Sequence, residues 1–139
     1  PLHMPLTRFK RITSRYGMRR DPFRRTMAMH AGIDFKAPYG APIMATAPGV
    51  VTKAGREGAY GNMVEIRHDH GFTTRYAHMS AIKVRHGARV SRGTVVGRLG
   101  NTGRSTGAHL HYETRRNGKS INPARFWKAW NALQKISQP

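Results

Sequence analysis

Short apolar segments bounded by glycine or proline turns recur along most of this 139-residue chain, which contains 15 glycines and 8 prolines. The segments are five or six residues long, too short for typical helices, and several alternate apolar with polar positions. They lie roughly 10 to 20 residues apart, a spacing that favours antiparallel strands over strand–helix–strand units. The predicted strands are Ile43–Ala47, Gly49–Ala54, Met63–His68, Thr73–His78, Thr94–Leu99 and His109–Thr114. We therefore expect a mainly β fold, an antiparallel sandwich or curled sheet.

One helix is expected, close to the C-terminal end. Asn122 can cap it, with Pro123 at the first helical position. Phe126, Trp130 and Leu133 then follow at i, i+4 and i+7, which places their side chains on one face. The pattern predicts a short C-terminal helix that packs on the domain. Contact with a further domain or with a membrane surface is the alternative.

The N-terminal part of the chain is rich in arginine and methionine. Arg8–Ile12 is expected to form a strand. Met18–Met29 is interpreted as a loop. It immediately precedes His30, so we expect it to form one wall of a cleft around that histidine. Residues 1–4 resemble a remnant of cleavage and cloning and are left out of the fold. The expected organisation is one domain over 5–125, followed by a C-terminal helix and tail over 126–139.

Five side chains are candidates for a metal-dependent site. On an extended chain alternate residues share a face, so His109 and His111 point the same way. His30 and Asp34 also share parity, and His78 follows a strand-like segment. An isolated pair of this kind is more often hydrogen-bonded or solvated than bound to metal. The five together favour a divalent-metal site with histidines to spare.

Such a surplus of donors points to catalysis. Zinc takes imidazole nitrogen and carboxylate oxygen, and a catalytic zinc uses three protein ligands together with a water. Bound zinc lowers the pKa of water to about 7, and a neighbouring histidine can move the proton. The chain has no cysteine, which excludes disulfides and thiolate ligands.

The order of these motifs resembles the lysostaphin-like, LytM-type family of zinc metalloendopeptidases, which cut peptidoglycan peptides. The matching motifs are Ser14-Arg-Tyr-Gly17, His30-Ala-Gly-Ile-Asp34, Gly40-Ala-Pro-Ile-Met-Ala45, Tyr60-Gly-Asn62, Tyr76-Ala-His78, Ser105-Thr-Gly-Ala-His-Leu-His111 and Asn122-Pro123. The resemblance covers about residues 11 to 125. It implies a β-sheet domain of the duplicated hybrid-motif type. Ala108 departs from the proline that commonly precedes the last motif, but this change removes no ligand.

The same resemblance implies roles for the five side chains. His30, Asp34 and His111 would be the ligands of one Zn²⁺ per chain, and His78 and His109 would be the catalytic pair. A biotinyl or lipoyl carrier domain is a rival, because the glycine-rich segment 84–97 resembles the corner of those domains. The lysine between methionines that such carriers need is missing. His68 and His70 flank Asp69 in a predicted turn, which makes them poor ligands.

The net charge of +19 raises a second rival, a nucleic-acid-binding domain. The basic residues are scattered as singles and pairs and form no nucleic-acid motif, so we expect no specific nucleic-acid partner. An anionic cell wall or membrane surface accounts for the charge equally well.

The resemblance makes peptidoglycan peptides the expected substrate. D-Ala–meso-diaminopimelate cross-links are favoured and glycine bridges come second. The competing function is a peptidoglycan-binding or amidase-activating module, and a regulatory or adaptor protein is a candidate partner. Such a protein would be exported to the periplasm or cell envelope.

Overall fold

The computed structural model describes residues 4–7, 9, 11–20, 27–103, 105 and 107–137. Two single 3-10 turns, η1 (Gly58–Tyr60) and η2 (Asp69–Gly71), join strands. The other elements are β1 (Arg11–Ser14), β2 (Gly17–Arg20), β3 (Met27–His30), β4 (Ile33–Lys36), β5 (Pro42–Met44), β6 (Gly49–Arg56), β7 (Asn62–Arg67), β8 (Phe72–Ile82), β9 (Arg89–Val90), β10 (Val95–Leu99), β11 (His109–Arg116), β12 (Lys119–Ile121) and α1 (Pro123–Ser137). The expectation of a mainly antiparallel β fold with one C-terminal helix is confirmed.

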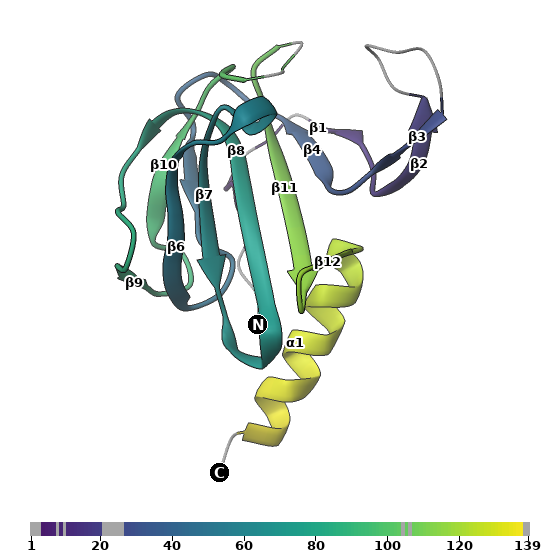
Figure 1. The fold of residues 1–139 in the computed structure, drawn as a ribbon, viewed down its shortest axis with the longest axis vertical. Helices are drawn as coiled ribbons and strands as arrows, with labels where there is room; N and C mark the ends of the chain where they lie inside the picture. The colour runs from purple at the N-terminus through teal and green to yellow at the C-terminus, as the bar shows by residue number, and fades with distance from the viewer. Residues whose placement is uncertain are drawn as a thin grey trace.

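One large antiparallel sheet forms the body of the molecule (Figure 1). Its strand order is β1-β4-β11-β8-β7-β6-β9, and β12 extends it beside β11. The long strand β8 pairs with β7 and β11 over its first part and with β10 over its last part. Because β10 also pairs with β5, the sheet curls back over itself. β2 and β3 form a separate hairpin that projects beside β4.

Each of the six predicted strands overlaps an observed strand. The strand expected over Arg8–Ile12 is observed at Arg11–Ser14, and residues 8 and 10 lie outside the described part. The interpretation of Met18–Met29 as a loop was wrong at both ends of this range, because β2 and β3 pair there with Met18 opposite Met29, and residues 21–26 lie outside the described part. Both methionines are exposed, so the hairpin lacks the apolar-polar alternation that would have revealed it.

The main core fills the inside of the curled sheet. Its largest side chains are fully buried: Phe35, Ile43, Met79, Leu110, Tyr76 and Tyr112. The hydroxyl of Thr46 lies 2.8 Å from the Tyr112 hydroxyl and 3.2 Å from that of Tyr76, so these buried polar groups satisfy one another. Leu110 anchors β11 in this core and leaves its two neighbouring histidines on the opposite face.

The helix α1 completes a second, smaller core. The Asn122 side chain accepts a hydrogen bond of 3.0 Å from the N–H of Ala124, which confirms the predicted cap. Phe126 and Trp130 are buried against Phe72 of β8, so the helix packs on the domain as predicted. Within the described residues, α1 and the 3-10 turns are too short or too polar to cross a membrane.

His68 is buried beneath this helix. Its Nδ1–H donates to the carbonyl of Pro48 (2.7 Å), and its Nε2 accepts from the hydroxyl of Thr74 (2.8 Å). The rings of Phe126 and Trp130 lie 6.0 and 5.8 Å from the imidazole. Burial lowers the pKa of His68 below its ordinary value.

This buried imidazole makes stability sensitive to mild acid. The unfolded chain takes up a proton at His68 below a pH of about 6.5, whereas the folded chain resists it, so stability falls as the pH drops. Between pH 7 and pH 5.5, wild type should lose more stability than His68→Gln, by at most about 1 kcal/mol, the limit that the unfolded pKa sets. Urea unfolding of both proteins at the two pH values measures this difference. Equal losses would show that His68 is not the responsible group.

Candidate metal and catalytic site

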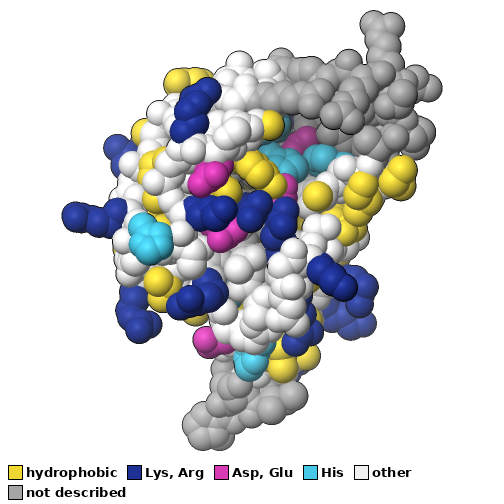
Figure 2. All heavy atoms as spheres, viewed as in Figure 1, with side chains coloured by type: hydrophobic (Ala, Val, Ile, Leu, Met, Phe, Trp, Pro, Cys, Tyr) yellow, Lys and Arg dark blue, Asp and Glu magenta, His cyan; other side chains and the backbone are white. Residues whose placement is uncertain are grey.

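The register of three neighbouring strands assembles the site. In β4 and β11, Asp34 lies opposite His111 and Lys36 lies opposite His109. On its other side His111 lies opposite Ala77 of β8, one residue before His78. The space-filling view shows histidine side chains gathered in a hollow with acidic side chains nearby (Figure 2). All five candidate residues are therefore brought together.

His30 and Asp34 reach the site from two different strands. His30 ends β3 and Asp34 lies in β4, so the chain turns between them. A side chain at Gly32, which is buried in that turn, would lie 2.5 Å from the carbonyl oxygen of Tyr112 and 2.9 Å from the ring of His111. Glycine is required there because β11 passes directly against the turn.

His78 is held in an unusual backbone conformation. Its φ is +65°, in the left-handed region that few residues other than glycine adopt. It sits where β8 leaves β11 and begins to pair with β10. Residues in strained backbone conformations cluster at functional sites. Here the change of conformation at the end of the β11 pairing places the ring 4.8 Å from that of His109.

Three side chains form a ready metal-binding group: His30, Asp34 and His111 present donor atoms that all lie within 4.8 Å of one another. Nε2 of His30 lies 3.3 Å from Oδ2 of Asp34, and Nδ1 of His111 lies 2.7 Å from Oδ1. Nε2 of His30 is buried and has no hydrogen-bond partner in the described part of the chain. A buried nitrogen without a partner is costly unless a ligand occupies it. Two imidazoles and one carboxylate fit the ligand set of a catalytic zinc.

The hydrogen bonds fix which ring nitrogen faces the site. A carbonyl oxygen only accepts, so Nδ1 is the protonated nitrogen in three of the histidines. His30 donates to Arg15 (2.8 Å), His78 to Thr102 (2.7 Å) and His109 to Gly107 (2.8 Å). In each of these rings Nε2 is left with a lone pair. Nε2 of His109 lies 3.9 Å from Oδ1 of Asp34, beside the proposed ligands.

The pKa values of His78 and His111 are shifted in opposite directions. Burial, reinforced by His109 and His111, lowers the pKa of His78 to about 4, so this ring is neutral at pH 7. Burial also disfavours a charge on His111, but hydrogen bonds with Asp34 and Glu113 outweigh it and raise its pKa to about 9. Burial likewise opposes ionisation of Asp34, yet contacts with His111 and His30 hold its pKa well below its usual range. Binding a metal at His111 must therefore displace a proton.

Glu113 was not among the predicted site residues, yet it is bound directly to one of them. Oε2 of Glu113 accepts a hydrogen bond of 2.8 Å from Nε2 of His111. Tyr60 donates to the same carboxylate at 2.9 Å, and Arg115 lies 3.2 Å from it. Ligating histidines commonly donate their second N–H to such a carboxylate. The sequence did contain one signal for Glu113. It lies two residues after His111 on the same strand, so it shares a face with His109 and His111.

Residues 28–123 match the model of a protein family described as peptidase family M23. The chain is 51% identical over 115 residues to the DD-carboxypeptidase/endopeptidase Mpg of Neisseria meningitidis. That alignment covers 83% of this chain and 26% of the relative, so the chain spans about a quarter of the length of this curated relative.

Two solved structures have a similar fold. A zinc-containing peptidase from Vibrio cholerae superimposes with a TM-score of 0.79 at 34% identity, over 86% of this chain and 37% of that one. The catalytic domain of lysostaphin from Staphylococcus simulans superimposes with a TM-score of 0.77 at 29% identity, over 86% of this chain and 92% of that one.

Proposed function

This chain belongs to peptidase family M23, and on that basis we propose that it is a zinc-dependent endopeptidase that hydrolyses peptide cross-links of bacterial peptidoglycan. One observation carries the proposal. Two histidines, His78 and His109, present unprotonated Nε2 atoms beside a group of three metal-ligating side chains. A site that only bound metal would not need this second pair.

The ligands of one zinc ion would be Nε2 of His30, the carboxylate of Asp34 and Nδ1 of His111. When bound, zinc supplies Lewis acidity, which lowers the pKa of water and polarises the scissile carbonyl. His78 and His109 hold their Nε2 lone pairs ready for the proton of the attacking water. As the carbon–nitrogen bond breaks, the same pair delivers a proton to the leaving amine.

The favoured substrate is the D-Ala–meso-diaminopimelate cross-link, and glycine bridges are the second candidate. The name of the Neisseria relative, a DD-carboxypeptidase/endopeptidase, supports cleavage next to a D-amino acid. Peptidoglycan lies outside the cytoplasmic membrane, so the protein would act in the periplasm or cell envelope. The scattered positive charge would favour contact with an anionic wall or membrane surface.

The competing function is a binding or amidase-activating module that works with a regulatory or adaptor protein. Modules of that kind do not need a catalytic histidine pair. The presence of all five side chains in one site favours the enzyme.

Turnover of purified muropeptide dimers of defined structure tests the proposal. The zinc-loaded protein should convert dimers to monomers, identified by mass, and His109→Ala should not. A zinc-loaded wild-type protein that binds dimers without cutting them would favour the binding module.

A further inference from the structure

Two cations lie in line with His109 across three strands. Arg11 of β1 is paired with Lys36 of β4, and Lys36 is paired in turn with His109 of β11. Neighbouring strands lie about 5 Å apart, so the three side chains form one row on the same face. We refer to Arg11 and Lys36 as the cationic pair.

The cationic pair has no acidic partner of its own. Both side chains are exposed, and neither forms an ion pair with any other residue that the structure describes. Asp34 lines the same cleft, but its carboxylate is already engaged by His30 and His111. Like charges placed directly opposite each other destabilise a sheet. A cost of this kind beside a catalytic site suggests a role in binding an anion.

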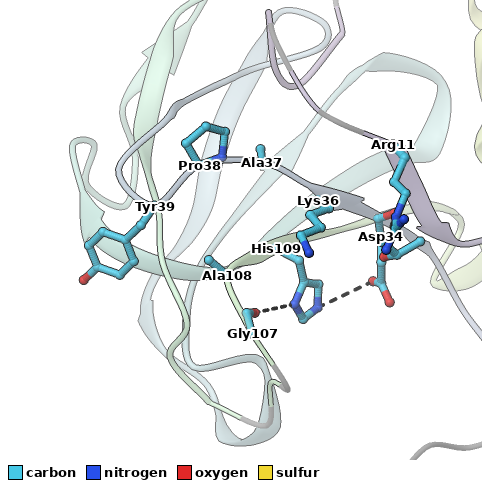
Figure 3. Close-up of a pocket in the computed structure, with 10 residues that line it drawn as sticks. Arg11, Asp34, Lys36, Ala37, Pro38, Tyr39, Gly107, Ala108 and His109 are labelled. Carbon is cyan, nitrogen blue, oxygen red and sulfur yellow. Dashed lines mark hydrogen bonds and ion pairs between the residues drawn. The ribbon is translucent and has the colours of Figure 1, made fainter.

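The pair borders the cleft that opens beside the site. This cleft has a volume of about 420 Å³ and is lined by both cations, by Asp34 and His109, and by the exposed ring of Tyr39. Figure 3 shows Arg11 and Lys36 extending from adjacent strands toward the region between Asp34 and His109. An anion held here would share the cleft with Asp34 and His109.

We propose that the cationic pair binds the free α-carboxylate of the substrate residue on the amine side of the scissile bond. The inference rests on the proposed function and specifies its substrate class. In a D-Ala–meso-diaminopimelate cross-link, the carbon bonded to the scissile nitrogen carries a free carboxylate. The terminal residue of a D-Ala–D-Ala peptide has the same group in the same place. A residue within a glycine bridge has none, because its carboxyl group is part of the next peptide bond.

The test compares substrates that differ only at that carboxylate. The first set is the cross-linked dimer with this group free or amidated, and the second is a D-Ala–D-Ala pentapeptide as free acid or amide. The variant is Arg11→Gln with Lys36→Gln. Its control is Arg85→Gln with Arg89→Gln, which removes two exposed charges next to and within β9, at the far end of the strand order.

Wild type and control should prefer the free acid about 10-fold in kcat/KM, as a charge-assisted hydrogen bond provides. The variant should lose this preference, so that its kcat/KM on the free acids falls to its own value on the amides. Dimer and pentapeptide together show whether a cross-link, a free terminus or both supply the carboxylate. A preference retained in the variant, or absent from wild type, would overturn the subsite.

A second experiment, which measures binding instead of cleavage, distinguishes failure of this proposal from failure of the proposed function. Affinities of the acid and amide dimers are measured with His109→Ala, alone and combined with the two glutamine substitutions. If wild type cuts nothing but the acid still binds more tightly through the pair, the subsite stands and the enzyme proposal fails. If wild type cuts the dimers without any carboxylate preference, the enzyme proposal stands and the subsite fails. If there is neither cleavage nor discrimination in binding, both fail.

Discussion

Replacing Asp34 by alanine is expected to remove zinc and activity together, whereas replacing His109 by alanine should remove activity alone. Asp34 would provide the charged ligand, and its carboxylate contacts both His30 and His111. Its loss should weaken zinc binding by more than about 100-fold, beyond the effect of losing a residue outside the ligand shell. His109 is not in the ligand group, and loss of its proton transfer should lower kcat by about 10²- to 10⁴-fold.

Two measurements on the same preparations separate these effects. Zinc content and affinity are determined by competition with a chelator, and cleavage is followed on muropeptide dimers. Near-normal turnover by zinc-loaded His109→Ala would remove this residue from the mechanism. Loss of zinc from His109→Ala would instead place it among the ligands.

Glu113→Gln is expected to weaken zinc binding by about 10- to 100-fold, the usual effect of losing a carboxylate behind a ligating histidine. The carboxylate only accepts from Nε2 of His111, so Nδ1 is the nitrogen of that ring that would bind the metal. A glutamine amide has nearly the same shape, but it lacks the charge and can also donate. Glu113 acts through His111 and is therefore a positioning residue.

Zinc affinity, measured by chelator competition, is the readout because a purely structural role would leave it unchanged. Tyr60→Phe is the matched control, since it removes one hydrogen bond to the carboxylate and keeps the carboxylate itself. It should have the smaller effect on affinity. If Glu113→Gln folds normally and binds zinc as tightly as wild type, the positioning role is wrong.

Local patterns predicted the strands that have one buried face. In β11, for example, the apolar Leu110 lies between two polar histidines. This alternation both identifies the strand and places Leu110 on the buried face and the histidines on the other. The helix was equally readable from its Asn122 cap and aromatic stripe. The hairpin β2–β3 was missed because both Met18 and Met29 face solvent. The way the sheet curls could not be predicted from the sequence either, because it depends on β8 pairing with β11 over one part of its length and with β10 over another.

The five side chains that the structure brings together were all named from the sequence, but the residues that contact and support them were not. Parity grouped His109 with His111 and His30 with Asp34, and the resemblance to a family supplied the expected role of each side chain. Glu113 shares that parity, yet nothing in the pattern says that it bonds to His111. The Arg11–Lys36–His109 row depends on the pairing of β1 with β4 and of β4 with β11. These strands are neighbours in the sheet in an order that the sequence does not follow.

The position of β11 also determines when the site is complete. β11 separates β4 from β8, and it is synthesised after both of them. Until β11 inserts, Asp34 lacks His111, and His78 lacks the ring of His109 beside it. A one-residue slip of β11 would turn both histidines into the core. A chain in which β11 has not yet paired with β4 and β8 therefore lacks the complete site, and the proposed hydrolysis depends on both pairings.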